Sequence, residues 1–207
     1  MVNEDLLNVD PPIRTPVIAV YRDSFTDQTG ARRSNSQFAT FSTAITQAPH
    51  AYLIRALQHA GKNNDGFFSV VERVGLDHVT KERQLIRSTR ESFDEDQKLP
   101  PLVFAGLIME GGVIGYESNT TSGGAGARYL GIGTSKAYRR DTVQVSLRTV
   151  SVTTGKVLME VLVSKTILSA SLDNDVFRFV ADSTELVEVE GGVVRNESVN
   201  IALQAAI

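Results

Sequence analysis

Histidines and acidic clusters are the residues of this sequence whose chemistry first suggests a metal site. His50, His59 and His78 are too few and too badly spaced for zinc, and the first two fall on or beside a predicted helix, where we expect them at the surface. The acidic residues within 94–96 and 173–175 do not follow the spacing of an EF-hand calcium loop. We therefore expect solvated acidic loops and no metal site.

Glycines form the next chemical candidate, a phosphate-binding loop. No Gly-Lys-Ser/Thr follows the cluster at 123–126, and the pair Gly131 and Gly133 lacks the third glycine of a dinucleotide fingerprint. No serine sits in a Gly-x-Ser-x-Gly elbow, and the sequence contains no cysteine. The sequence thus gives no anchor for an enzyme, and we expect no catalytic residue and no cofactor.

A short polar and aromatic segment, NSQFATF, admits two interpretations. Its candidate residues are Asn35, Ser36, Gln37, Phe38, Thr40 and Phe41. Propensity alone favours a surface loop whose two phenylalanines tuck into the core. The functional alternative is a narrow ring of such side chains, contributed by several subunits, that lines a pore and controls passage by its diameter and wetting. The residue pattern leaves both interpretations open.

The first half of the chain must position these residues, and its pattern predicts a small α/β layer. Residues 1–15 suggest an extended arm and residues 23–30 are turn-like. Apolar residues repeat with helical spacing after Pro49, and a second helical face follows after Gly75. The order is β-α-β-α-β, with strands in 16–22, 67–72 and 103–116 and helices at 49–60 and 75–90.

The second half predicts mainly strands. Val143 and Val145 alternate with polar neighbours, which fits a half-buried sheet and a barrel wall equally well. Thr153 to Gly155 predict a tight turn, and Ser198 is a plausible cap for a C-terminal helix. The predicted strands are 142–152, 156–168, 176–180 and 186–194.

The segment 115–138 is too rich in glycine for a helix, yet its aromatic and aliphatic residues have strand spacing. Such a segment suits a transmembrane β-barrel, where the pattern of each strand is weak. No apolar run approaches the ~20 residues of a spanning helix, so a spanning function would have to use strands of about 10 residues. The 207 residues carry a net charge of −3, which predicts no global attraction to nucleic acid.

Several long blocks of the sequence resemble the curli secretion channel family, CsgG. They are GYESNTTSGGAGARYLGIG, SLRTVSVTTGKVL, SKTILS, VFRFV, FSTAITQAPHAYLIRAL and VVERVGLDHVTKERQLIR. The likeness extends from about Pro16 to Ile207. It implies an α+β fold in which a periplasmic α/β domain, 16–114, carries two long hairpins.

The resemblance also implies how the hairpins work. They map to 115–145 and 169–194, separated by periplasmic-domain strands at 146–168, and 195–207 begin the C-terminal helix. About nine protomers would each add four strands to one barrel of about 36 strands. Arginines in a barrel are expected to face the lumen or the rims, because lipid exposure is costly. The hairpin residues singled out are Tyr116, Arg128, Tyr129, Ile132, Phe177, Arg178 and Phe179.

The family's constriction loop maps to 34–41. Phe41 matches its constriction phenylalanine and Thr40 the neighbouring asparagine, while the family's tyrosine has its place near Ser36 or is supplied by Phe38. The resemblance implies an outer-membrane lipoprotein that exports unfolded curli-type amyloid subunits without nucleotide, together with periplasmic and surface accessory proteins. The family's acylated N-terminal cysteine is missing, so we expect an anchor only in the full-length protein.

Two alternatives stay open at this point. One is a relative that serves another surface fibre, such as a holdfast anchor, because the constriction segment departs from the family pattern. The other is a soluble periplasmic interaction module whose hairpins fold onto its own domain. An enzyme is a more distant third possibility.

Overall fold

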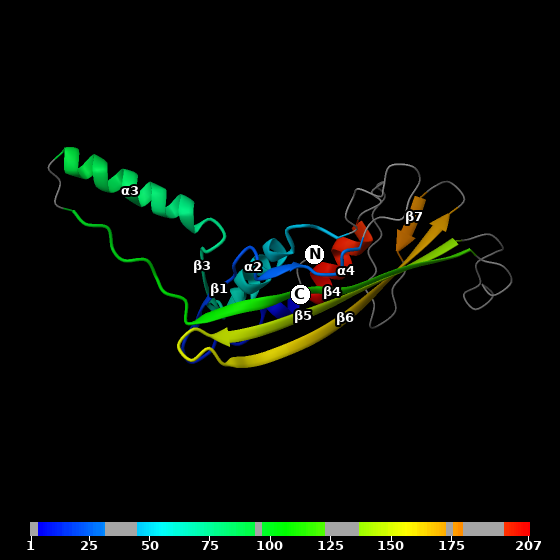
Figure 1. Ribbon diagram of the computed structural model, residues 1–207. Coiled ribbons are helices and arrows are strands. Elements are labelled where there is room, and N and C mark those ends of the chain that lie inside the picture. The colour runs from blue at the N-terminus through cyan, green and yellow to red at the C-terminus, as the bar shows by residue number, and fades with distance from the viewer. Residues whose placement is uncertain (1–3, 32–44, 94–96, 123–136, 173–175, 180–196) are drawn as a thin grey trace.

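The computed structural model describes residues 4–31, 45–93, 97–122, 137–172, 176–179 and 197–207. One mixed sheet dominates it, with helices packed on one face and a separate helical arm (Figure 1). The elements are α1 Glu4–Leu7, β1 Val17–Ala19, β2 Phe25–Asp27, α2 Pro49–His59, η2 Lys62–Asn64, β3 Ser69–Val71, α3 Leu76–Ser92, β4 Leu107–Ser122, β5 Ala137–Ser151, β6 Val157–Leu172, β7 Val176–Phe179 and α4 Glu197–Ala206. The mixed α+β class expected from the sequence is confirmed.

The sheet joins a parallel half to an antiparallel half. Its strand order is β3-β1-β4-β5-β6-β7, and β2 also pairs with β4. β1 lies parallel to β3 and β4, because α2 and α3 provide the long crossovers that parallel strands need. From β4 onward the strands are antiparallel neighbours in chain order. Each of β4, β5 and β6 spans 15 or 16 residues, so they extend well past the parallel half.

The hydrophobic core lies between the sheet and the helices α2 and α4. Val143 and Val145 of β5 are fully buried, and they pack in one cluster with Leu53 of α2 and Leu203 of α4. The alternation noted in the sequence therefore has its apolar side toward the helices. The helical spacing after Pro49 is confirmed too, because Leu53 and Leu57 are the buried face of α2.

Three local expectations differ from the structure. Residues 23–30 contain the short strand β2, because Phe25 is fully buried and pairs with Gly111 of β4. The arm 1–15 contains the helical turn α1, where Leu6 accepts a hydrogen bond of 2.8 Å from the Gly61 amide. The strand expected from residue 142 begins at Ala137, because its ladder with β4 continues to Ser122.

Candidate functional site

Many of the residues singled out in the sequence lie outside the described residues. This applies to all six constriction residues at 35–41 and to Arg128, Tyr129 and Ile132. The structure places Tyr116 on β4 and places Phe177, Arg178 and Phe179 on β7. The expected strand 186–194 also lies outside the described part of the chain. The site must therefore be built from the described elements on either side of the predicted constriction segment and from the long strands β4, β5 and β6.

Both flanks of residues 32–44 are fixed to the core. On one side, Asp27 ends β2 and its Oδ1 accepts hydrogen bonds from the amide and hydroxyl of Thr29, at 2.9 and 2.7 Å. Thr29 in turn accepts a hydrogen bond from the Ala31 amide at 3.0 Å. On the other side, Ile45 is only 2% exposed and belongs to the core cluster. Residues 27–31 are thus held to the end of β2, and Ile45 is held in the core, on the two sides of the segment predicted as a constriction.

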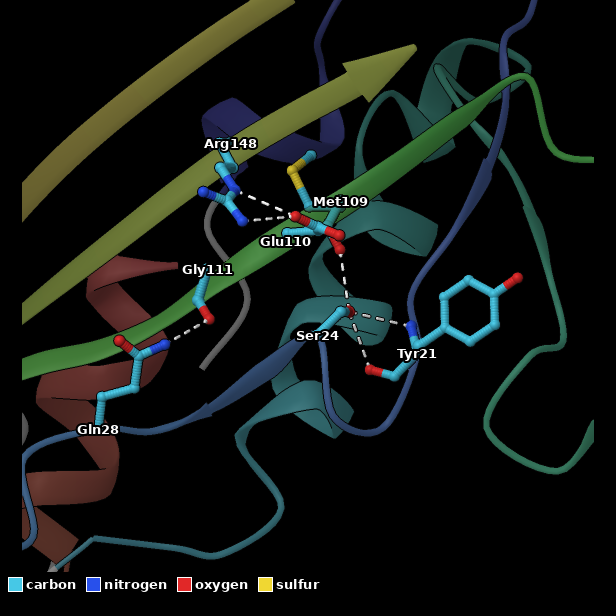
Figure 2. A network of polar contacts seen from close by, with 7 residues as sticks. All are labelled: Tyr21, Ser24, Gln28, Met109, Glu110, Gly111 and Arg148. Carbon is cyan, nitrogen blue, oxygen red and sulfur yellow. Dashed lines mark hydrogen bonds and ion pairs between the residues drawn. The ribbon is translucent and has the colours of Figure 1, made fainter. Parts of the chain in front are cut away.

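Ser24 is the centre of the polar network that attaches β2 to β4 (Figure 2). Its hydroxyl accepts from the Tyr21 amide at 3.1 Å and lies within donating distance of two carbonyls, 3.0 Å from that of Tyr21 and 3.2 Å from that of Met109. Its own carbonyl accepts from the Gly111 amide at 2.8 Å. The hydroxyl therefore acts structurally, because its hydrogen-bonding capacity is used by backbone groups.

Gln28 continues this attachment beyond the end of β2. Its backbone amide donates to the Val113 carbonyl at 2.9 Å, and its side-chain Nε2 donates to the Gly111 carbonyl at 3.3 Å (Figure 2). The side-chain amide lies over Gly112, where a Cβ would come within 2.9 Å of Gln28 Nε2 and 2.4 Å of the Thr26 carbonyl oxygen. Residue 112 thus has to be glycine for β2 and Gln28 to approach β4 this closely.

A bulge interrupts β4 just beyond these glycines. The register with β5 shifts between Val113 and Gly115, and Ile114 in between is 42% exposed. Gly111 has φ +148°, and a Cβ there would lie 1.9 Å from the Ser146 carbonyl oxygen of β5. Glycine pairs inside a strand pattern are the sequence signal for such a bulge or close approach, and the pair Gly111-Gly112 carried that signal.

An open cavity of about 370 Å³ lies over this part of the sheet. It is lined by Asp23, Ser24, Gln28, Glu110, Gly111, Ile114, Ser146, Arg148 and Glu160. A second cavity of about 300 Å³ shares Gln28 and Ile114 with it and extends toward Tyr116 and Gln144. The surface is a polar groove lined by more carboxylates than cations. The Ser24 hydroxyl within it already forms hydrogen bonds with backbone groups.

Arg148 is the cation of the groove and is held by Glu110. Its Nε and Nη2 atoms donate to the same carboxylate oxygen, at 3.0 and 2.8 Å (Figure 2). Both residues are direct partners across β4 and β5, and Glu160 is the direct partner of Arg148 on β6. The three charged residues thus form one row across the sheet, with the cation in the middle.

Tyr116 and Asp141 connect the strands of the first hairpin where it leaves the core. Asp141 is fully buried, and the Tyr116 hydroxyl donates to its Oδ1 at 3.3 Å. On the opposite face, the hydroxyls of Thr142 and Thr166 lie 3.0 Å apart and link β5 to β6. Sequence reasoning had singled out Tyr116 but not Asp141, because an aspartate at a strand position gives no sign of burial.

His50, expected at the surface, is half-buried. It lies in the first turn of α2, and its Nδ1 is buried and has no hydrogen-bond partner within the described residues. Burial lowers the pKa of His50 below its usual 6.5, and the nearby Arg22 guanidinium lowers this pKa further. Both effects favour the neutral imidazole over the charged one.

The described residues contain no group of three or more potential metal ligands. None of their helices is long and apolar enough to cross a membrane.

Comparison with known proteins identifies the family. The model of the family "CsgG: Curli production assembly/transport component CsgG" matches residues 2–207. The curli production assembly/transport component CsgG of Escherichia coli strain K12 is 38% identical over 208 residues, which cover 99% of this chain and 72% of the relative. The proteins of the same name from Salmonella typhimurium strain LT2 and Citrobacter koseri show the same identity and coverage. The likeness noted from the sequence blocks is confirmed, and the chain belongs to the CsgG family of curli production assembly/transport components.

Proposed function

We propose that this chain is the protomer of an outer-membrane secretion channel that exports unfolded curli-type fibre subunits. Family membership supports a role in curli assembly and transport. The observation that carries the channel is the way two antiparallel pairs extend from one end of the sheet. Tyr138 pairs with Thr121 on one side and with Ala170 on the other, so the far ends of β4, β5 and β6 lie together. β7 joins β6 at this same end.

Four strands from one chain are too few to close a barrel. In a membrane every backbone group must be paired, and an open sheet edge does not occur in the hydrocarbon region. Pooling the hairpins of about nine copies into one barrel of about 36 strands would remove these edges. The proposed assembly is thus a homo-oligomer in the lipid bilayer, with the α/β domain in the periplasm and a lipid anchor in the full-length protein.

The segment 34–41 is the proposed constriction, with Phe41 as its aromatic side chain. Its described flanks at Ala31 and Ile45 are tied to β2 and to the core, which supports a segment that starts and ends at the same place in each copy. Export is proposed to need no nucleotide: confinement of an unfolded chain on one side costs entropy, and exit through the pore relieves it. Periplasmic and surface accessory proteins of the secretion system are proposed as further partners.

Single-channel conductance in a planar bilayer tests the proposal. The detergent-extracted oligomer should give discrete, long-lived conductance steps, and Phe41→Ala should raise the step size because a smaller side chain widens the pore. Ile13→Ala, an exposed apolar position outside the sheet, is the matched control and should leave the step unchanged. An oligomer without conductance would refute the channel and favour a periplasmic interaction module. An unchanged step for Phe41→Ala would place the constriction elsewhere.

A further inference from the structure

The helix α3 belongs to an arm that has no core of its own. None of its 17 residues is buried, and Figure 1 shows it standing away from the sheet. The return segment, residues 97–105, runs back beside the helix without regular secondary structure. We call residues 72–93 and the return segment the arm. Among the described residues, none of the arm belongs to the core cluster, so packing against the core does not fix its direction.

Hydrogen bonds within the arm join its two limbs. On α3, the Arg83 guanidinium donates to the Pro100 carbonyl, and the Arg90 guanidinium donates to the Gln97 carbonyl at 2.7 Å. Both acceptors lie on the return segment, so the helix and the return segment are connected at two places along their length. The arm therefore has internal connections that do not involve the sheet.

The arm meets the sheet through two short stretches of chain. One stretch leaves β3 after Val71, and the other leads into β4 through Gly106. Gly106 is held by the sheet, because its amide donates to the Val17 carbonyl at 2.9 Å and its carbonyl accepts from the Val152 amide at 3.0 Å. Among the described residues, no backbone hydrogen bond joins 72–105 to the rest of the chain. The connection of the arm to the sheet therefore depends on the residues at its base.

Arg73 connects these two stretches at the base of the arm. Its Nη1 donates to the Glu72 carbonyl at 2.7 Å on the outgoing stretch, and its Nη2 donates to the Val103 carbonyl at 2.9 Å on the returning stretch. The Glu72 carboxylate also accepts from the Gly75 amide at 2.7 Å, which stabilises the turn into α3. The planar guanidinium directs both donors at once, so Arg73 holds the two stretches at a set separation.

We propose that the arm turns as one unit about a hinge at its base, and that Arg73 limits this motion. A hinge consists of a few residues at the ends of elements that absorb the change in backbone angles. Residues 72–74 and 103–105 are in this position, because no helix or strand includes them. Segments with few buried apolar contacts move at the lowest cost in free energy. The inference concerns a single chain and does not rest on the proposed channel.

Exposed side chains at the base agree with a hinge there. Val103 and Phe104 are 59% and 85% exposed, although they stand only a few residues before β4. Side chains of this size would resist a rotation of the arm if they were packed against the sheet, because a close-packed interface does not deform continuously. Their exposure leaves the bonds of Arg73 as the contact that opposes the motion in this part of the structure.

Distances between pairs of spin labels, measured by double electron–electron resonance, test the hinge. The sequence contains no cysteine that would compete for the label. The hinge pair, Arg55→Cys on α2 and Leu85→Cys on α3, has one label on each side of the base. The arm pair, Leu85→Cys and Lys98→Cys, lies within the arm. All three positions are exposed. Labelled protein is diluted with an excess of unlabelled protein, so that each distance is measured within one chain.

The two pairs should respond differently to a change at Arg73. With Arg73 present, the distance distribution of the hinge pair should be wider than that of the arm pair. Arg73→Ala should widen the hinge-pair distribution about twofold and leave the arm-pair distribution unchanged, because the bonds of Arg83 and Arg90 remain. Arg73→Lys keeps the charge but not the planar fork, and should also widen the hinge-pair distribution. Arg87→Ala, at an exposed arginine of the same helix, is the matched control and should change neither distribution.

Three results would overturn the inference. Equal widths for the two pairs with Arg73 present would show that the arm is fixed to the sheet. An arm-pair distribution that widens in Arg73→Ala would show that the arm does not move as one unit. A hinge-pair distribution that is the same in Arg73→Ala would show that Arg73 does not limit the motion. Circular dichroism checks that each variant folds, which a position outside every helix and strand should allow. None of these results depends on conductance, so they leave the test of the channel separate.

Discussion

Arg148 on β5 places two of its guanidinium nitrogens, Nε and Nη2, on one carboxylate oxygen of Glu110 on β4, at 3.0 and 2.8 Å. The two side chains are 52% and 31% exposed, so water screens the pair, and by itself it contributes little to stability. The ion pair matters because it belongs to the row of charged residues across β4, β5 and β6. Glu160 stands opposite Arg148 on β6, and Asp23 lines the same cavity, so the arginine separates carboxylates that would otherwise face one another.

Reversing the charge of Arg148 should therefore cost more than removing it. Arg148→Ala should lower the free energy of unfolding by at most about 1 kcal/mol, as for other exposed ion pairs. Arg148→Glu places like charges directly opposite each other on neighbouring strands and should cost more than Arg148→Ala at low salt. Urea unfolding at low and high sodium chloride measures both changes. Salt should narrow the difference in unfolding free energy between Arg148→Ala and Arg148→Glu. Arg55→Glu on the exposed face of α2 serves as the control. If the difference between the two Arg148 variants does not depend on salt, repulsion is excluded as its cause.

Gly111 should be the least replaceable of the described strand glycines. Its Cβ would lie 1.9 Å from the Ser146 carbonyl oxygen, so Gly111→Ala forces β4 and β5 apart inside a continuous ladder. We expect a loss of at least about 3 kcal/mol of unfolding free energy, since the backbone itself must shift. Gly155→Ala is the matched control: it also has positive φ, at +67°, but nothing lies within 4 Å of its Cβ.

That control should lose only about 1 kcal/mol, the cost of a left-handed conformation for a residue with a Cβ. Thermal or urea unfolding of the two variants measures the difference. Similar losses for both would show that conformation, and not the close approach of β5, explains the glycine at 111.

Features of the fold that depend on short-range patterns could be predicted from the sequence. Leu53 and Leu57 mark the buried face of α2, and Val143 and Val145 mark the buried face of β5, because helical and strand periodicities are local. β2 was missed because three residues around Phe25 become a strand only through their long-range pairing with β4. The burial of Asp141 has the same origin. The burial of Asp141 depends on how α4 and β4 pack against β5, and no local residue pattern predicts this packing.

The position of α3 shows a further limit of sequence reasoning. Its predicted bounds, 75–90, agree closely with Leu76–Ser92, and its apolar residues predicted one helical face. The structure buries none of them: among the described residues the helix lies beside residues 97–106 and stands away from the sheet. Periodicity predicts that a helix has an apolar face, but it does not predict whether that face packs against the rest of the chain. The constriction residues at 35–41 lie outside the described residues, so their role stays a prediction.

Acid should destabilise the domain through His50. Burial and Arg22 lower the pKa of this histidine in the folded state below 6.5, so the unfolded state takes up a proton more readily. The free energy of unfolding should therefore fall as the pH drops from about 6.5 toward the lower pKa of the folded state, and should be unaffected by this group well above 6.5. Equilibrium unfolding at a series of pH values measures the effect.

His50→Gln, which cannot be protonated, should remove this part of the pH dependence. His78→Gln on the exposed surface of α3 is the control and should leave the pH dependence of the unfolding free energy as it is in the wild type. Identical pH profiles for the wild type and His50→Gln would show that another group is responsible.

Tyr116 should stabilise the base of the first hairpin through its hydroxyl. Tyr116→Phe keeps the ring but removes the donor to Asp141 Oδ1, so a fully buried carboxylate loses one of its hydrogen bonds. The expected loss is about 1–3 kcal/mol of unfolding free energy, as for a buried acceptor left without one partner. Tyr21→Phe is the control, because the side chain of Tyr21 is 38% exposed and should lose less than about 0.5 kcal/mol. Hydrogen exchange at β4 and β5 amides should accelerate near Asp141 in Tyr116→Phe alone. Unchanged exchange there would show that the hydroxyl does not hold the two strands together.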